Sequence, residues 1–188
     1  MRLFLALLLL SGAAFSQQPV APPAMTDTEI VAVFNGISLH ASKIEPMLQQ
    51  LHPNDWVAKG APDTYVVQWN STLEQLRAIQ SDMSALAQHP DQMTECMKAL
   101  FRVQASHQAL DSLMGGLRRY QNPALAELIE SVAAEDQSQL DRLEQYVLEL
   151  ANAKDQQFAV VDREAQRCRA TLSRQPVADP SKTNRRTQ

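Results

Sequence analysis

The sequence predicts an all-α fold, an elongated antiparallel bundle of about four helices that ends in a long C-terminal helix. Glycine is scarce, at 5 residues among 188, and residues that lose little freedom in a helix, such as Ala, Leu, Gln, Glu and Arg, dominate. Apolar residues recur in steps of three and four over long stretches, whereas strand-forming residues never cluster in alternation. Both observations favour helices packed along apolar faces.

The start of the chain has the organisation of a cleavable secretion signal, which we assign to residues 1–16. A positive charge precedes the apolar run 3–10, and small residues at Ala14 and Ser16 form a cleavage site. The alternative is a membrane anchor, but the run is shorter than the roughly 20 residues that cross a bilayer. We therefore expect an exported chain, periplasmic or secreted, that begins at Gln17 and has no transmembrane segment.

Removal of the signal leaves one domain flanked by two irregular segments. Residues 17–25 hold three prolines and predict a flexible leader, and the polar residues 174–188 predict a disordered tail. Between them, residues 26–173 form the predicted helical bundle. Loss of Arg2 leaves 16 basic and 21 acidic residues, a net charge of −5. This mild acidity argues against a nucleic-acid partner.

The first two helices follow from their apolar repeats and end signals. Thr26 and Glu29 have the spacing of a capping box, and the apolar repeat that follows predicts a helix over 26–51. Asn35-Gly36 predicts a weak point within it, because glycine costs about 1 kcal/mol in a helix relative to Ala. Residues 52–61 form a connector with a single turn around Trp56, and a second helix runs over 62–88.

The third and fourth helices have the longest patterns. The third, over 91–120, repeats its apolar residues in alternating steps of three and four without exception. Asn122 as N-cap and Pro123 as the first helical residue then begin a fourth helix over 123–172. At 1.5 Å per residue it spans about 75 Å, against about 40 Å for each of the others. It therefore overhangs its neighbours unless it bends, and a stutter in the repeat places any bend near Lys154. We favour the straight form, whose overhang a partner covers.

Two cysteines in an exported chain raise the question of a disulfide. In an antiparallel hairpin, Cys96 lies about 36 Å and Cys168 about 67 Å from the turn at Gln121, too far apart for a bond if the last helix is straight. Three alternatives stay open: an intramolecular bond across a bent helix, an intermolecular Cys168 pair, or two buried thiols. The buried thiols are favoured because both cysteines lie at apolar seam positions.

The sequence lacks the motifs of several enzyme and metal-binding classes, and we therefore expect a protein without enzymatic activity, cofactor or metal. There is no His-Glu-x-x-His, no Glu-x-x-His, no Cys-x-x-Cys-His and no Gly-x-Ser-x-Gly. His107 lies on the apolar seam, where we interpret it as a core residue. Trp56, Tyr65 and Trp69 are the one aromatic concentration, which we expect to close one end of the bundle. The alternative is a small apolar ligand pocket formed by these three residues.

Two stretches carry a resemblance to other proteins. Trp56 to Pro62, followed by Tyr65 and Gln68, and Glu164 to Arg169 together resemble uncharacterised exported bacterial helical proteins. The resemblance implies export and a helical fold, and it implies no activity.

The overhang of the last helix carries the functional expectation. Its apolar seam needs a cover that the shorter helices do not supply, so we expect a protein partner or self-association there. The expected partner surface consists of Phe158, Val161, Ala165, Cys168 and Leu172. The sequence thus favours a non-enzymatic protein, acting as a scaffold, adaptor or chaperone-like factor in the cell envelope or outside. The alternative is a ligand-sensing bundle that binds a small apolar molecule near Trp56 and Trp69.

Overall fold

The computed structural model describes residues 25–173. The regular elements in this range are all helices, and it contains no strand. The predicted signal 1–16, residues 17–24 of the predicted leader and the predicted tail 174–188 lie outside the described residues. The all-α prediction is confirmed. The elements in chain order are α1 (Asp27–Leu48), α2 (Pro53–Ala58), α3 (Thr64–Leu86), α4 (Met93–Tyr120), α5 (Pro123–Ala134) and α6 (Gln137–Ser173).

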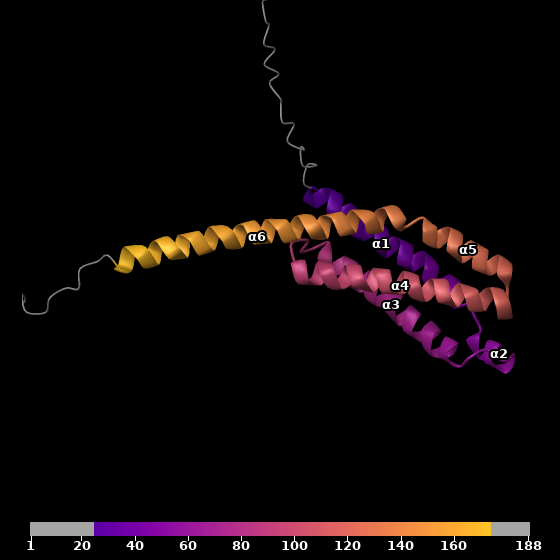
Figure 1. The fold of residues 1–188 in the computed structure, drawn as a ribbon. Helices are drawn as coiled ribbons and strands as arrows, with labels where there is room; N and C mark the ends of the chain where they lie inside the picture. Colours follow the sequence, from indigo (N-terminus) through magenta and orange to yellow (C-terminus); the bar gives the residue numbers. More distant parts are fainter. Residues whose placement is uncertain (1–24, 174–188) are drawn as a thin grey trace, which may run out of the picture.

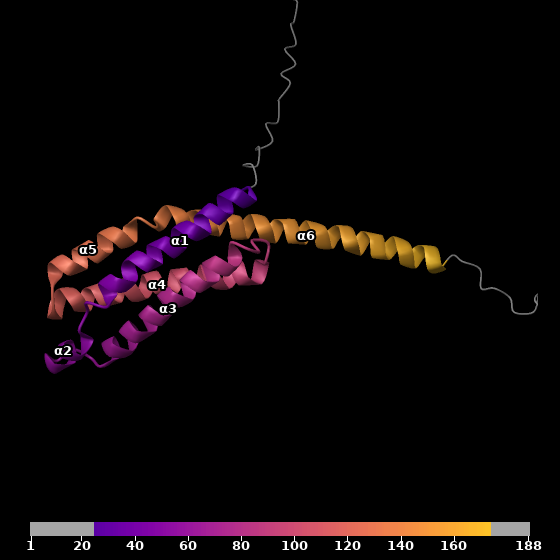
Figure 2. The ribbon, with the colours of Figure 1, turned by 180° about the vertical axis from the view of Figure 1, so that it is seen from behind.

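The helices form an elongated bundle from which one helix projects. In Figure 1, α1, α3 and α4 run side by side, α5 and the first part of α6 lie along them, and the short α2 closes one end. The second part of α6 extends far beyond the opposite end of the bundle, as Figure 2 also shows from behind. α1 packs on α3, α5 and α6, and α4 packs on α3, α5 and α6. The first part of α6 is thus covered by two helices.

The core follows the predicted seams closely. The third predicted helix corresponds to α4. Over more than four turns, α4 buries most of its apolar seam against α3, α5 and α6. The buried seam residues of α4 are Cys96, Leu100, Val103, Leu110, Met114 and Leu117. Burial of these side chains stabilises the bundle by about 1.5 to 3 kcal/mol for each large aliphatic group.

The predicted fourth helix is bent, which corrects the straight form that the sequence favoured, and the bend does not lie near Lys154. The chain leaves helical geometry at Glu135 and Asp136, so that α5 and α6 are separate helices, and α6 continues through Lys154 without a break. No proline or glycine marks the break. Its cause is tertiary, because Asp136 is buried against His107 of α4 while its carbonyl accepts hydrogen bonds from the first turn of α6.

Local signals in the sequence locate several helix ends. Thr26 caps α1, with Oγ1 accepting a bond from Glu29 N and the Glu29 carboxylate accepting one from Thr26 N, which is the predicted capping box. Asn122 Oδ1 accepts bonds from the amides of Ala124 and Leu125, which confirms the predicted N-cap of the next helix. The second helix begins at Thr64, two residues after the predicted Pro62.

The predicted weak point at Gly36 does not interrupt α1, which is helical from end to end. A Cβ on Gly36 would lie 3.1 Å from Cδ of Gln139 in α6. A side chain at this position would therefore require the end of Gln139 to shift by a few tenths of an ångström.

Candidate functional site

The projecting part of α6 leaves an apolar face uncovered. Leu150 is the last buried residue of α6, and residues 151–173 extend the helix by about 34 Å beyond it. Phe158 is 73% and Leu172 66% exposed, values that are high for large apolar side chains. We call the five predicted surface residues the α6 stripe; of these, Ala165 is half-buried and the other four are exposed: Phe158, Val161, Ala165, Cys168 and Leu172.

The α6 stripe continues the face of α6 that is buried in the bundle. Buried residues of α6 lie at Leu140, Leu143, Val147 and Leu150. Steps of three and four lead from Leu150 through Lys154 to Phe158 and along the stripe, so all of these side chains lie on one side of the helix. The register therefore places the uncovered stripe on the side of α6 that faces the bundle, and Figure 1 shows the bundle lying along one side of the first part of α6.

Charge is distributed unevenly along the projecting part of α6. Its first half, residues 151–162, holds Lys154, Asp155 and Asp162, for a net charge of −1. Its second half, residues 163–173, holds Glu164 and three arginines, for a net charge of +2. The side-chain hydrogen bonds found here join groups three or four residues apart in α6, such as Gln166 Nε2 to Asp162 Oδ2. The charged groups therefore stay available to a partner.

The two cysteines are free and lie in different surroundings. Cys96 is buried at the start of α4, where its thiol donates to the carbonyl oxygen of Pro90 at 3.3 Å. Burial raises the pKa of the Cys96 thiol to about 11, and the nearby Asp91 carboxylate adds to the effect. Cys168 is exposed on the α6 stripe. Of the alternatives left open by the sequence, a buried thiol therefore describes Cys96 and does not describe Cys168.

The three aromatic residues proposed as a ligand pocket are packed against one another and against the chain. Trp56 is fully buried in α2, and its Nε1 donates to Gln121 Oε1 at 2.9 Å. Trp69 Nε1 donates to the carbonyl oxygen of Leu48 at 2.7 Å, and the Tyr65 ring stands edge-on to Trp56 at 5.7 Å between centroids. A Cβ on Gly116 would lie only 2.8 Å from the Tyr65 ring. The packing here is tight, as expected for the closed end of the bundle.

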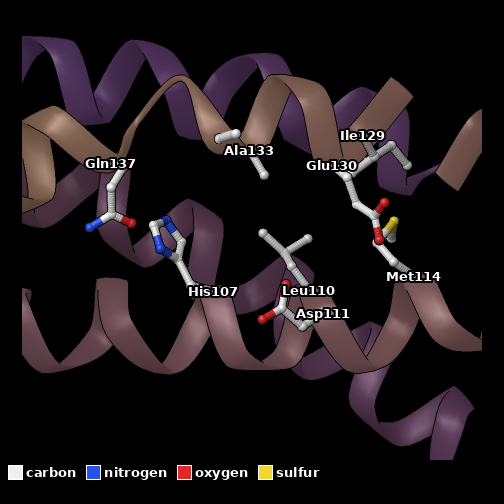
Figure 3. Close-up of a pocket in the computed structure, with 9 residues that line it drawn as sticks. His107, Leu110, Asp111, Met114, Ile129, Glu130, Ala133 and Gln137 are labelled. Carbon is white, nitrogen blue, oxygen red and sulfur yellow. The ribbon is translucent and has the colours of Figure 1, made fainter. Parts of the chain in front are cut away.

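An open groove lies elsewhere, between α4 and α5. Its volume is about 320 Å³. Figure 3 shows His107 and Leu110 rising from α4 toward α5, while Glu130 reaches from α5 toward Met114. Apolar side chains form much of the lining, and His107, Asp111, Glu130 and Gln137 add polar groups. Glu130 is engaged in an ion pair with Arg118.

A small buried polar cluster lies at the inner end of this groove. Nε2 of His107 is 3.8 Å from Oδ2 of Asp136, which is only 3% exposed. His40 of α1 lines the same void of about 10 Å³ as these two residues. Oδ1 of Asp136 and Nε2 of His40 have no hydrogen-bond partner among residues 25–173. Desolvation lowers the pKa of His40, and the Asp136 carboxylate opposes this effect.

Sequence reasoning missed His40 and Asp136 as members of a cluster. The available signal was a carboxylate at a seam position, since Asp136 occupies an apolar register between Val132 and Leu140. A carboxylate at such a position has to be paired or protonated. Among residues 25–173, no group of three or more His, Cys, Asp and Glu side chains is arranged to hold a metal ion.

The fold and the site define a class, a helical-bundle protein with a projecting amphipathic helix. No described helix combines the length and the apolar character that a bilayer span requires. No protein-family model, curated protein or solved structure matches this chain. The function therefore has to be inferred from the geometry of the chain itself.

Proposed function

We propose that this chain is an exported, non-enzymatic protein that works through protein–protein contacts in the cell envelope or outside, as a scaffold, adaptor or chaperone-like factor. The observation that supports it is the α6 stripe, which continues a buried face beyond the bundle. Apolar surface of this kind, rimmed by charged groups, is typical of a site for another protein. The α6 stripe supplies the binding surface, and the bundle holds it in place.

Geometry supports a rigid projection. The first part of α6 is fixed to α1 and α4 through Leu140, Leu143 and Leu150, so the projecting turns share one continuous helix with a packed segment. Most helical stability in proteins comes from packing of an apolar face, which the projecting turns lack. A partner that covers the α6 stripe would therefore also stabilise the projecting turns.

The binding role is tested by charged substitutions on the stripe. Phe158→Glu combined with Val161→Glu should abolish capture of other proteins, or of a second copy, when the chain is crosslinked in its native envelope. Matched controls are Leu148→Glu and Val160→Glu, because both residues are exposed apolar positions of α6 on other faces. Equal capture by the stripe variant and the controls would contradict the proposal.

Export is tested separately by intact-mass measurement. Cleavage after Ser16 should give a mature chain that begins at Gln17. A chain recovered with residues 1–16 still attached would contradict cleavage and would leave the binding proposal in place.

A second candidate function is the binding of a small apolar molecule, and the α4–α5 groove favours it over the packed Trp56 region. A volume of about 320 Å³ falls at the lower end of the range for ligand sites. Ala133→Trp should fill the groove and abolish any chemical-shift changes that small apolar probes cause at Leu110 and Met114. Probe binding that survives this substitution would place the ligand elsewhere.

A further inference from the structure

The position of the α6 stripe restricts what can cover it. The stripe lies on the same side of α6 as the bundle. A helix that covers residues 151–173 must therefore lie on that side of α6, in the space beyond the end of the bundle. One end of the covering helix therefore meets the end of the bundle, where α3 turns into α4. The uncovered stretch of α6 that such a helix would pack on is about 34 Å long. This length equals that of the projecting part of α6 itself.

A second copy of the chain can meet these conditions in one orientation. If two α6 helices pair in parallel through their stripes, each bundle has to lie on the stripe side of its own helix, and both bundles then occupy the same space. In the antiparallel arrangement the two bundles lie at opposite ends, and the tip of each α6 reaches the end of the other bundle. Shape alone thus selects the antiparallel pair.

The antiparallel pair also gives the apolar residues suitable neighbours. When the tip of one helix reaches the other bundle, Phe158 lies opposite Cys168 of the second copy, and Val161 lies opposite its Ala165. Lys154, whose aliphatic stem can cover apolar surface, then lies opposite Leu172. Large and small side chains alternate across the pair, as packed helix interfaces require.

Charge favours the same arrangement. Antiparallel pairing lays the basic second half of each projecting segment on the acidic first half of the other. Asp155 and Arg169 lie on the same flank of the stripe and come within about 3 Å of the same level along the two helices. Neither residue forms an ion pair within the described part of the chain. Asp162 on one flank and Glu164 on the other each meet their own copy near the two-fold axis, which weakens the pair and favours a reversible dimer.

The end of the bundle adds to this complementarity. Tyr146 donates to the carbonyl oxygen of Pro90 at this end, where burial, and to a smaller extent Cys96 and the carboxylates of Asp27, Asp91 and Glu149, raise the pKa of its hydroxyl to about 12. This acidic end is where the net basic tip of a second copy would arrive.

From these observations we infer that the α6 stripe is covered by a second copy of this chain, whose residues 151–173 pack antiparallel on it to form a two-fold symmetric dimer. This inference rests on the proposed function, since it names the partner of the same surface.

Sedimentation equilibrium at increasing protein concentration gives the first test. The wild-type chain should reach twice the monomer mass, whereas Phe158→Glu combined with Val161→Glu should remain monomeric and keep the circular-dichroism melt of the bundle. The Val160→Glu control should dimerise like wild type. A wild-type chain that stays monomeric at every concentration overturns the inference, and the proposed function still stands if the stripe captures a different protein.

Disulfide trapping tests the register. In the antiparallel pair the two Cys168 residues lie about 15 Å apart along the axis, beyond the reach of a disulfide, so the wild-type dimer should stay reduced in oxidised glutathione. Phe158→Cys should form a bond to Cys168 of the second copy, identified by peptide mapping, whereas Val160→Cys should not. Bonding between the two Cys168 residues of wild type would overturn the antiparallel arrangement.

Charge reversal tests orientation without cysteine chemistry. Arg169→Glu places like charges beside Asp155 of the second copy, and Asp155→Arg does the same beside Arg169, so each variant alone should dimerise less than wild type. A mixture of the two should form a heterodimer, because each interface then joins opposite charges. In a parallel pair these positions lie about 21 Å apart, so a mixture that gives no recovery overturns the inference.

Discussion

Nε2 of His107 on α4 lies 3.8 Å from Oδ2 of Asp136, the residue at which the C-terminal helical segment breaks into α5 and α6. His40 of α1 completes this cluster and lines the same small void as these two residues. Three elements that are distant in the sequence thus meet at one buried polar point. The stability of the bundle should therefore depend on the protonation of the imidazole that is most strongly desolvated there.

We expect acidification to destabilise the bundle through His40. Burial, opposed by Asp136 and supported by His107 and Lys43, holds the pKa of His40 below its usual value of about 6.5. The unfolded chain then binds more protons than the folded chain as the pH falls below about 6.5, so the free energy of unfolding decreases. His40→Leu should flatten this dependence in urea unfolding between about pH 7.5 and pH 5.

The control for this dependence is His89→Gln, which changes an exposed histidine at the end of α3. It should leave the dependence of stability on pH close to that of wild type. An unaltered slope in His40→Leu would show that other groups carry the effect.

Adjacent glycines in α4 provide a matched pair for packing. A Cβ on Gly116 would lie 2.8 Å from Tyr65 and 2.9 Å from Trp56, whereas a Cβ on Gly115 meets nothing within 4 Å. Gly116→Ala should destabilise the bundle by about 1 to 3 kcal/mol through overpacking. Gly115→Ala should stabilise it by roughly 0.5 to 1 kcal/mol through helix propensity. Thermal unfolding followed by circular dichroism measures both, and equal effects would contradict the tight packing of the aromatic end.

Gln121 joins α2 to the turn between α4 and α5. Its Oε1 accepts bonds from Trp56 Nε1 and from the amide of His52, and its Nε2 donates to the carbonyl oxygen of Gln50. Gln121→Ala leaves the buried Trp56 donor without a partner and should cost about 1 to 3 kcal/mol in urea unfolding. Gln121→Glu keeps both accepted bonds and should cost less. The reverse order of the two variants would contradict this assignment.

The N-cap at Asn122 should contribute measurably to the hairpin between α4 and α5. Its side chain accepts from two amides of the first turn of α5, so Asn122→Ala should cost about 1 kcal/mol. Asn122→Asp keeps the acceptor and should stay close to wild type. Unfolding in guanidinium measures the difference, and a loss in Asn122→Asp as large as in Asn122→Ala would point to a role other than capping.

Local chemistry allowed a large part of the fold to be predicted. The caps at Thr26 and Asn122 depend on side chains that bond to amides two or three residues away, and such contacts can be read from a short window of sequence. The buried face of α4 also depends on a local property, the spacing of apolar residues. These features needed no information on which helix packs against which.

The only sequence signal at Asp136 was a carboxylate at an apolar register, and the tertiary structure was needed to place the break there. Neither proline nor glycine stands there, and the helical pattern continues across it, so its position follows from burial of a carboxylate beside His107 and from the packing of α5 on α4. The sequence favoured a straight last helix and placed any bend at the stutter near Lys154, where α6 in fact continues without a break.

The sequence by itself determined that the chain is helical, where most helices begin, and that an apolar seam continues from Leu150 to Leu172. Only the tertiary structure decided how much of that seam is covered, because burial depends on where α1, α3 and α4 end in space relative to α6. Periodicity marks a face that can be buried, whereas its burial requires a neighbour within contact distance. For Phe158, Val161 and Leu172 the bundle provides no such neighbour.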